Sequence, residues 1–360
     1  MAKQSGDSSF SALARREERL AFLLLIPTLV ILLVIAFYPL GSVFVTSFTN
    51  QQFGSPTPAS FVGLDNYKQL LSVTIMELPP VIDPATGKPQ IDPKTGEVKY
   101  EDPLFVLPRQ PARYHDIGQF SLFGKRYVIG ALDRYFLPSI KDTLVFSIIS
   151  VLFELILGIG VALVVNTKFQ GRGVMRAMML VPWAIPTAVS SRIWEWMFQP
   201  NRVGLFNVIS QALGWTDGQY AFLAEPKFQL PAMIIIDVWK TTPFMALLLL
   251  AGLQLIPGDL YEAADVDGAG AFRRFWTITI PLLRPTIAIA LIFRTLDAVR
   301  VFDLFQIVLA QSRFSAASYA YYQLVGNAAM GISSAASVVI FILILIFAVF
   351  YIRALNAEEA

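Results

Sequence analysis

Residues 262–281 read Glu-Ala-Ala-Asp-Val-Asp-Gly-Ala-Gly-Ala-Phe-Arg-Arg-Phe-Trp-Thr-Ile-Thr-Ile-Pro and separate two long apolar runs. Residues 262–264 begin a segment of good helix formers, and the glycines within 267–270 interrupt it. Aromatic and aliphatic side chains follow, with Phe272 and Phe275 among the first. The pattern predicts a helix, a glycine turn and a second helix. Because these apolar side chains lie outside the long apolar runs, they indicate a surface for a protein partner.

Outward from this segment, apolar runs dominate the chain. Hydrophobic residues make up 55% of the 360 residues and charged residues 15%, whereas soluble domains reach only about 45 to 50% apolar with glycine included. No charged residue occurs at 21–64 or at 314–352, and a membrane-spanning helix needs roughly 20 apolar residues. We therefore predict an all-α integral membrane protein, which excludes soluble enzymes, disordered scaffolds and disulfide-stapled secreted domains. The six predicted spans are 21–40, 139–165, 174–197, 230–250, 282–310 and 332–354.

The distribution of basic residues predicts the orientation of these spans. Six spans place both termini on the same side of the membrane, and Lys and Arg in short loops favour the cytoplasmic side. A cytoplasmic N-terminus puts eleven such residues inside and three outside. We therefore expect a multi-pass protein of the cell inner membrane with both termini in the cytoplasm. The inner residues are Lys3, Arg15, Arg16, Arg19, Lys168, Arg172, Arg176, Arg273, Arg274, Arg284 and Arg353, and the outer ones are Arg202, Lys227 and Arg313.

Residues 41–138 differ in composition from the remainder of the chain, because they are rich in lysine, arginine and proline. Two Asp-Pro-x-Thr-Gly sequences, beginning at Asp83 and Asp92, predict turns between short strands. We expect a small extracytoplasmic insert that is partly β-structure. The predicted division is a cytoplasmic N-terminus with the first span (1–40), the insert (41–138), a core of five spans (139–354) that includes loop 252–281, and a cytoplasmic tail (355–360).

Several kinds of chemistry are excluded by residues that the sequence lacks. There is no cysteine, and the only histidine is His115, which argues against thiolate nucleophiles, histidine catalysis and multi-histidine metal sites. The net charge of +2, without a basic block, argues against nucleic acid. No Gly-x-x-x-x-Gly-Lys-[Ser/Thr] phosphate loop occurs, so the chain is not expected to hydrolyse ATP. We predict no catalytic residues, no metal and no cofactor.

Residues 262–281 carry a resemblance to a known family. Glu262-Ala263-Ala264, three residues, Gly268, nine residues and Ile278-x-Ile280-Pro281 resemble the EAA loop of importer permeases of ATP-binding-cassette (ABC) systems. Isoleucine stands before the proline, where the family usually has leucine. The segments that resemble carbohydrate permeases of the maltose and trehalose type are Trp239–Phe244, Ala251–Pro257, Phe302–Phe305 and Gly331–Ser337, so the likeness covers about 139–354. The insert is similar to that of the larger permease subunit of maltose-type importers.

The resemblance implies a type I importer permease core, in which this loop is a coupling helix seated in a cleft of an ATPase subunit. Glu262 would meet a basic ATPase residue, Gly268 would permit a sharp turn, and Phe272 and Phe275 would be apolar anchors; Ala263, Ala264 and Asp267 complete the motif. The implied partners are a second permease subunit, an ATPase dimer, an extracytoplasmic sugar-binding protein and a di- or oligosaccharide substrate. The competing reading of the loop is an ordinary amphipathic hairpin with a capping glycine.

The fifth predicted span contains Arg294, Asp297, Arg300 and Asp303 at successive steps of three. On one helix they follow a single stripe, and their alternating signs allow each to pair with the next. Charges within a membrane normally face a protein interior or a wet cavity. Two readings stay open. Asp297 and Arg300 bind sugar hydroxyls in a translocation cavity, with Asp303 as a further candidate, or the stripe is a structural ladder of ion pairs.

Other polar residues are also candidates for the sugar path. Asp237 and Trp239 lie in the fourth predicted span, where Asp237 could instead pair with Lys240 and Trp239 could be an interfacial anchor. Asn327 precedes the sixth span. Glu154, alone in the second, predicts a contact with another helix.

Two other classes of function compete with the ABC permease. An ion-coupled secondary transporter would use the intramembrane charges to relay protons or bind a coupling ion. A membrane-embedded enzyme is disfavoured because the sequence has no motif for a nucleophile or a metal.

Overall fold

The computed structural model describes residues 12–93 and 96–358, so Lys3 and the last two residues of the predicted tail lie outside it. Within those ranges, five helices are long and apolar enough to cross a membrane. Five of the six predicted spans coincide with them, which makes the protein a largely helical, multi-pass membrane protein. The five segments are Glu17–Thr46, Phe136–Asn166, Pro226–Leu253, Ala271–Val308 and Met330–Tyr351.

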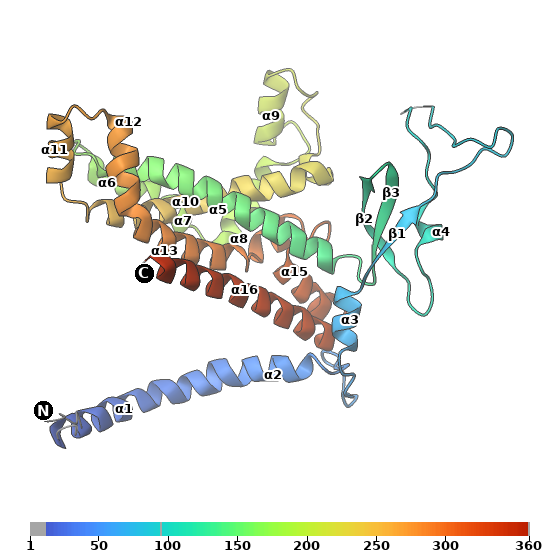
Figure 1. Ribbon diagram of the computed structural model, residues 1–360, viewed down its shortest axis with the longest axis horizontal. Coiled ribbons are helices and arrows are strands. Elements are labelled where there is room, and N and C mark those ends of the chain that lie inside the picture. The colour runs from blue at the N-terminus through green and yellow to red at the C-terminus, as the bar shows by residue number, and fades with distance from the viewer. Residues whose placement is uncertain (1–11, 94–95, 359–360) are drawn as a thin grey trace, which may run out of the picture.

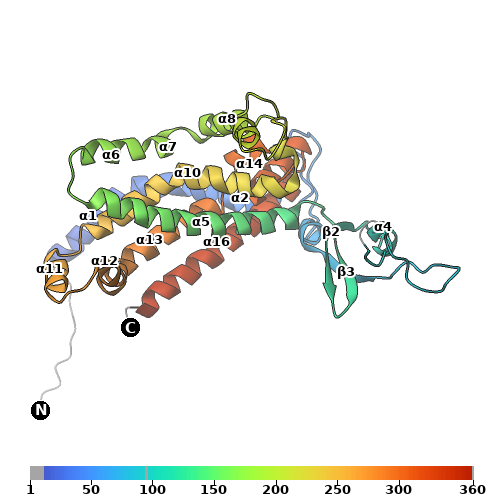
Figure 2. The same cartoon turned by 90° about the horizontal axis from the view of Figure 1, so that it is seen from above.

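The predicted third span, 174–197, is not one continuous helix and is therefore not among these five. The segment is divided into α6 (Arg172–Met179), α7 (Val181–Ala184) and α8 (Thr187–Met197). Ile185 is extended, with φ −69° and ψ 130°, because the ring of Pro186 disfavours the α conformation in the preceding residue. The pieces still follow one another along the bundle (Figure 2).

The long helices lie side by side, and the two ends of the bundle differ (Figures 1 and 2). The bundle contains α5 (Phe136–Asn166), α10 (Pro226–Leu253), α13 (Ile280–Ala298) and α16 (Met330–Glu358). The described part of the chain begins at residue 12 and ends at residue 358, and both of these points lie at the same end of the bundle as the segment 254–279. We call it the loop end. The insert lies at the opposite end, which we call the insert end.

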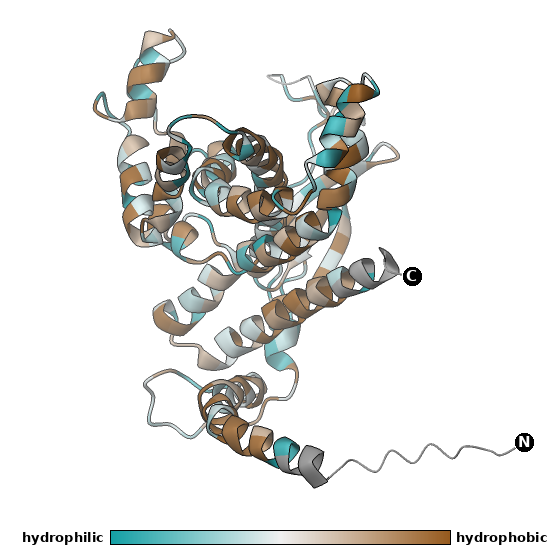
Figure 3. Ribbon diagram, turned by 90° about the vertical axis from the view of Figure 1, so that its left-hand side faces the viewer, coloured by the Kyte–Doolittle hydropathy of each residue, from teal (hydrophilic) through white to brown (hydrophobic). Residues whose placement is uncertain are grey.

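The N-terminal span stands apart from this bundle. It comprises α1 (Ala12–Leu32), a π-helical turn (Leu33–Phe37) and α2 (Tyr38–Thr46). None of its most apolar window is buried, and the ribbon of this helix is coloured mostly as hydrophobic in Figure 3. Contact with the bundle is made near the insert end, where the Phe44 and Phe341 rings meet edge to face at 5.7 Å.

Close packing of α5, α10 and α13 forms the core. A Cβ atom at Gly158 would lie 2.7 Å from Met245, and one at Gly252 would lie 2.4 Å from Thr286. Small residues at helix contacts let membrane helices approach closely. Phe146 of α5 meets Phe305 of α14 (Asp303–Val308) edge to face at 5.4 Å.

The insert contains a small antiparallel sheet, in agreement with the predicted β-content. Its strands are β1 (Val73–Leu78), β2 (His115–Leu122) and β3 (Lys125–Ala131), in the order β1-β3-β2. The predicted turns contain Gly87 (φ +65°) and Gly96 (φ +71°), flanked by the bridges Ile82–Pro89 and Ile91–Val98. Lys94 and Thr95 of the second turn lie outside the described residues. The short helices α3 (Asp65–Leu71) and α4 (Pro103–Val106) complete the insert.

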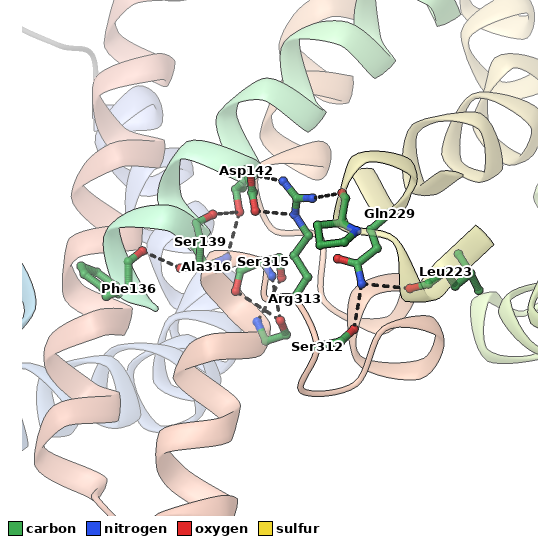
Figure 4. Close-up of polar contacts among 12 residues, drawn as sticks. Phe136, Ser139, Asp142, Leu223, Gln229, Ser312, Arg313, Ser315 and Ala316 are labelled. Atoms are coloured by element: carbon green, nitrogen blue, oxygen red, sulfur yellow. Dashed lines mark hydrogen bonds and ion pairs between the residues drawn. The ribbon is translucent and has the colours of Figure 1, made fainter. Parts of the chain in front are cut away.

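A polar network joins the core helices at the insert end (Figure 4). The Arg313 guanidinium donates to both oxygens of Asp142 on α5, at 2.6 and 2.7 Å, and to the carbonyl of Pro226 at the start of α10, at 2.8 Å. Gln229 donates to the carbonyl of Leu223 at 2.9 Å. Bidentate geometry makes the Arg–carboxylate pair directional as well as attractive. The loop before α15 (Ala316–Tyr321) is thereby fixed to two spans.

Candidate functional site

The segment 254–279 at the loop end has the predicted form of helix, glycine turn and helix. It contains α11 (Asp259–Val266), α12 (Ala271–Arg274) and a π-helical turn (Phe275–Thr279) that leads into α13. Gly268 has φ +72°, a left-handed conformation that disfavours side chains. Its N–H donates to Asp265 O at 3.0 Å, and the Ala269 N–H donates to Ala264 O at 2.8 Å. These two bonds form a Schellman ending, which satisfies carbonyls of α11.

The same loop presents apolar side chains on a rigid frame. Phe272 is 79% exposed and Trp276 55% exposed, while Phe275 is half-buried and meets Trp276 edge to face at 5.2 Å. An ion pair between Asp265 and Arg274 connects the two arms. Large exposed aromatic groups on an ordered loop are typical of a surface that docks to another protein. Of the other motif residues, Glu262, Ala263 and Asp267 are exposed and Ala264 is half-buried.

A buried cluster of charges lies inside the bundle. The Arg294 side chain of α13 is 2% exposed and the Glu154 side chain of α5 is fully buried. Arg294 Nε lies 2.5 Å from Glu154 Oε2 and Arg294 Nη2 lies 2.7 Å from Glu154 Oε1. Arg294 also donates to Asp237 of α10 at 3.0 Å and to Asp297 at 2.5 Å. The interhelical contact predicted for Glu154 is therefore confirmed, and it joins residues 140 positions apart.

This cluster has one guanidinium for three carboxylates. A guanidinium offers five N–H donors in a planar fork and so can serve several acceptors. The Thr241 hydroxyl, 2.6 Å from Glu154 Oε1, is a further donor. Because transfer of charges out of water is costly, a buried ion cluster is retained only with such complete hydrogen bonding. Arg294 thus connects α5, α10 and α13 through charge.

A cavity of about 290 Å³ adjoins the cluster. Four of the six residues predicted for the sugar path line it, namely Asp237, Asp297, Arg300 and Asp303. The sequence-based reasoning did not identify three hydroxyl residues of α8 that also line it, Thr187, Ser190 and Ser191. The only signal in the sequence was a pair of serines in an apolar segment. The Ser191 hydroxyl is buried without a hydrogen-bond partner among the described residues, so it is available to a ligand.

The predicted ladder of charges ends after its first pair. Arg294 and Asp297 are paired, but α13 ends at Ala298 and Asp303 begins α14, so the four residues are not on one helix. Arg300 Nε donates instead to the Leu296 carbonyl at 3.1 Å. Because the chain turns between the two helices, Arg300 and Asp303 both border the cavity.

The alternative pairing of Asp237 with Lys240 is also not found. Asp237 accepts a hydrogen bond from Arg294, whereas Lys240 Nζ lies 2.5 Å from the carbonyl oxygen of Ile185. That carbonyl is free because Pro186 interrupts the helix there. Lys240 therefore holds the broken span against α10 and lines the cavity as a cation.

The remaining two candidates lie elsewhere. Trp239 packs edge to face on Trp194 at 5.5 Å and is not part of the cavity lining. Asn327 lies toward the insert end, where its amide donates to Gln323 at 2.9 Å. It borders a separate cavity of about 500 Å³ that also includes His115. The structure therefore does not bring these two residues together with the other four.

Aromatic side chains help to line a second cavity, of about 270 Å³, which also borders Asp297 and Arg300. Trp183 and Phe244 are stacked there with their centroids 5.5 Å apart and their planes 11° apart, and Phe293 lies nearby. Asp297 and Arg300 are common to both cavities. Polar groups and flat aromatic faces are therefore offered side by side, a combination suited to a ligand with both hydroxyl groups and apolar faces.

Comparison with known proteins gives matches over most of the chain. Residues 154–357 match the model of a family described as "Binding-protein-dependent transport system inner membrane component". The trehalose/maltose transport system permease protein MalF of Thermococcus litoralis is 47% identical over 226 residues, 61% of this chain and 75% of that protein. The trehalose transport system permease protein SugA of Mycobacterium tuberculosis is 30% identical over 343 residues, 95% of this chain and 90% of that one.

Two further matches extend this picture. The sulfoquinovosyl glycerol transport system permease protein SmoG of Agrobacterium fabrum is 31% identical over 344 residues, 94% of this chain and 91% of that protein. Among solved structures, a chain of a bacterial alginate ABC transporter, in complex with a periplasmic protein that carries an alginate pentasaccharide, superposes with a TM-score of 0.67. It is 20% identical and covers 93% of both chains, so it supports the fold alone.

Proposed function

Because this chain belongs to the family of inner membrane components of binding-protein-dependent transport systems, we propose that it forms half of a pore for a di- or oligosaccharide. The proposed substrate belongs to the trehalose and maltose class. Permease relatives whose names specify trehalose or maltose are 30% and 47% identical to the chain. The protein is a subunit of a transporter, and its proposed role is to give the sugar a path through the membrane without covalent chemistry.

The observation that carries this proposal is the convergence of Asp237, Asp297, Arg300 and Asp303 on one cavity in the membrane-spanning bundle. Carboxylates accept hydrogen bonds from sugar hydroxyls and a guanidinium donates to them, and hydrogen bonds to charged groups are the stronger kind. The stacked rings of Trp183 and Phe244 offer an adjoining flat surface to the apolar face of a sugar ring. Pockets that combine aromatic surface with a few placed polar groups are typical small-molecule sites.

The loop end supplies the proposed connection to an ATPase. The exposed Phe272 and Trp276 would enter a cleft of a partner ATPase, with Phe275 packed behind them and Glu262 facing a basic residue there. Segment 254–279 runs directly into α13, which carries Arg294 and Asp297. Movement of the loop by the ATPase would therefore reach the cavity through one continuous helical segment. ATP hydrolysis would occur in the partner, and the sugar path would open alternately to the two sides.

The remaining proposed partners follow from the placement of the insert and of segment 254–279 at opposite ends of the bundle. The insert end would face outward and receive an extracytoplasmic sugar-binding protein, while both termini and segment 254–279 would face the cytoplasm (Figure 1). A second permease subunit would complete the pore in a heterodimer. Arg172, Arg273 and Arg274 lie in segments at the loop end, as the preference of basic residues for the cytoplasmic side requires.

The test uses the complex purified through this chain and reconstituted in proteoliposomes with its binding protein. Arg300→Gln should raise the sugar concentration needed for half-maximal uptake, because the variant removes a charged donor from the cavity, and basal ATPase activity should remain. Arg192→Gln is the matched control, because Arg192 is exposed and its ion pair is with Glu195 on its own helix. Equal loss of uptake and ATPase activity in Arg300→Gln would make the residue structural. Trehalose, maltose and sn-glycerol 3-phosphate compared in one assay would identify the substrate class.

An ion-coupled transporter gives a different result in the same vesicles. Uptake would then proceed with this chain alone, would stop when an uncoupler collapses the proton gradient, and would be indifferent to ATP. The full burial of Glu154, with both its oxygens bound to Arg294, argues against a role as a proton carrier.

A further inference from the structure

The helix α9 (Leu205–Ala212), between α8 and α10, buries two of its three polar residues, Asn207 and Ser210, whereas Gln211 is exposed. Asn207 is fully buried. Its amide donates to the carbonyls of Gln199 and Tyr220 at 2.8 and 3.0 Å and accepts from the Tyr220 N–H at 2.9 Å. Ser210 is 4% exposed, and its hydroxyl lies 2.7 Å from that of Thr216. The hydrogen bonds of these two buried side chains are therefore made within the segment 199–220.

Most apolar residues of the same segment are exposed, although Phe206 is half-buried and stacks on Phe198 at 4.2 Å. Val208 and Ile209 are exposed on the helix, Leu213 is 55% exposed directly after it, and Trp215 is 75% exposed. A surface helix in water has the opposite arrangement, with apolar residues toward the protein and polar residues toward solvent. An inverted helix indicates that its outer side faces a medium that is not water.

The direction of α9 identifies that medium. In Figure 1, α9 stands across the common direction of the spans, and in Figure 2 the same segment is seen nearly end-on. It follows the end of α8 at Met197 and precedes the start of α10 at Pro226. Met197 ends the broken segment 172–197 that runs along the bundle, and Pro226 begins a helix long and apolar enough to cross a membrane. A helix at that level, lying across the spans, is parallel to the membrane surface.

The flanking residues fit a lipid boundary. Trp215 is aromatic and exposed, and tryptophan concentrates where membrane and water meet. The cationic side chains Arg202 and Lys227 lie on either side of the segment, and Lys227 Nζ is 5.0 Å from the Phe228 ring. Cations beside an apolar surface are suited to lipid phosphates. The exposed apolar stripe of α8, with Val189, Ile193 and Trp196, extends the same kind of surface along the bundle.

We propose that residues 203–215 form an interfacial anchor, with their apolar side inserted at the boundary between headgroups and acyl chains of the outward-facing leaflet. The occupant of this surface is lipid. The anchor fixes the junction of α8 and α10 at a constant depth, and these two helices carry Ser190, Ser191 and Asp237 of the central cavity. The inference needs the membrane placement of the spans but not a particular substrate.

The absence of cysteine from the sequence makes the test direct. Single cysteines at Val208 and Leu213, labelled with a nitroxide in the assembled complex in proteoliposomes, report access to oxygen and to a water-soluble nickel chelate. Ile148→Cys on the exposed side of α5 is the lipid reference, and Lys88→Cys in the insert is the water reference. We expect the ratio of oxygen access to chelate access to be several-fold higher at positions 208 and 213 than at position 88. The ratio at 208 and 213 should be similar to that at 148.

Two outcomes overturn the proposal. Access to the chelate equal to that at 88 would place the segment in water, and protection from both reagents would mean that a protein subunit covers it. A second measurement needs no label. Lipids brominated on their acyl chains should quench part of the tryptophan emission of the complex, and Trp215→Phe should remove part of that quenching. Trp276→Phe, at the opposite end of the bundle, is the control for loss of one indole. Unchanged quenching in Trp215→Phe would also overturn the proposal.

Discussion

The guanidinium of Arg294 and the carboxylate of Glu154 meet in two hydrogen bonds, of 2.5 and 2.7 Å, and neither side chain is exposed to solvent beyond 2%. This pair joins α13, which continues from the loop-end segment, to α5, which leads back from the insert. It also holds Arg294 in place for Asp237 and Asp297. The bundle is therefore held together by charge at the level of the cavity.

Removal of the Arg294 guanidinium should reduce stability more than neutralisation of the Glu154 carboxylate. Arg294→Met leaves Glu154 and Asp237 without their cation in a buried site, and breaking a buried pair costs roughly 3 to 5 kcal/mol. Glu154→Gln keeps hydrogen-bonding groups in place and leaves Arg294 with two carboxylates. We expect a lower thermal unfolding temperature for both purified variants, with the larger decrease for Arg294→Met.

Arg300→Met is the control for loss of a guanidinium, because Arg300 is exposed and forms no ion pair with the described residues. If Arg300→Met lowers the unfolding temperature as much as Arg294→Met does, burial does not determine how much stability is lost when a guanidinium is removed.

The turn of the proposed coupling loop should depend on Gly268 and not on Gly270. Gly268 has φ +72°, whereas Gly270 has φ −64°, and a Cβ atom at either position would meet open space. A side chain in the left-handed conformation costs roughly 1 to 2 kcal/mol, so Gly268→Val should reshape the turn and Gly270→Val should not. Uptake driven by ATP should fall in Gly268→Val at normal protein levels in the membrane. Equal uptake in the two variants would contradict the role of this turn.

The sequence predicted those features that depend on neighbouring residues. The turns at Gly268, Gly87 and Gly96 arise from local glycine and proline chemistry, and the long spans arise from composition. The partnership of Glu154 with Arg294 could not be predicted, because the two residues are 140 positions apart and only the packing of α5 against α13 brings them together. The charge ladder failed for a related reason, since nothing in the periodicity marks the end of α13 at Ala298. The break before α8 could have been read from Pro186.

The hydroxyl of Ser191 should contribute to sugar affinity. It is buried, lines the cavity and has no partner among the described residues. A hydrogen bond contributes about 0.5 to 1.5 kcal/mol. Ser191→Ala should therefore raise the sugar concentration needed for half-maximal uptake by roughly two- to tenfold. Ser150→Ala is the matched control, because that hydroxyl is also buried without a partner but does not line the cavity. Uptake kinetics with each variant are the measurement. If both variants and the parent protein need the same sugar concentration for half-maximal uptake, Ser191 does not contribute to sugar binding.

Arg313 should support the insert end of the core without a role in the sugar path. Its bonds to Asp142 and Pro226 connect the loop before α15 to α5 and α10 (Figure 4). Loss of the partner of a largely buried carboxylate costs about 1 to 3 kcal/mol or more. Arg313→Gln should therefore lower the unfolding temperature, with half-saturation for sugar unchanged. Lys141→Gln is the control, because Lys141 is exposed and lies beside Asp142 on α5. A change in sugar half-saturation in Arg313→Gln, with stability retained, would contradict this assignment.

Residues 82–100 form an arm of the insert, and this arm should be removable without loss of the fold. The backbone N–H of Val81 donates to Lys99 O at 2.9 Å, and that of Glu101 donates to Pro79 O at 3.0 Å, so the two ends of the arm lie side by side. Deletion of residues 82–100 with a short glycine linker leaves β1, β2 and β3 intact. The complex should assemble and keep its basal ATPase activity, because the described residues of the arm lie away from the core spans (Figure 1). We expect reduced stimulation of that activity by the binding protein, since the arm lies at the insert end. Stimulation equal to that of the full chain would show that the arm takes no part in docking.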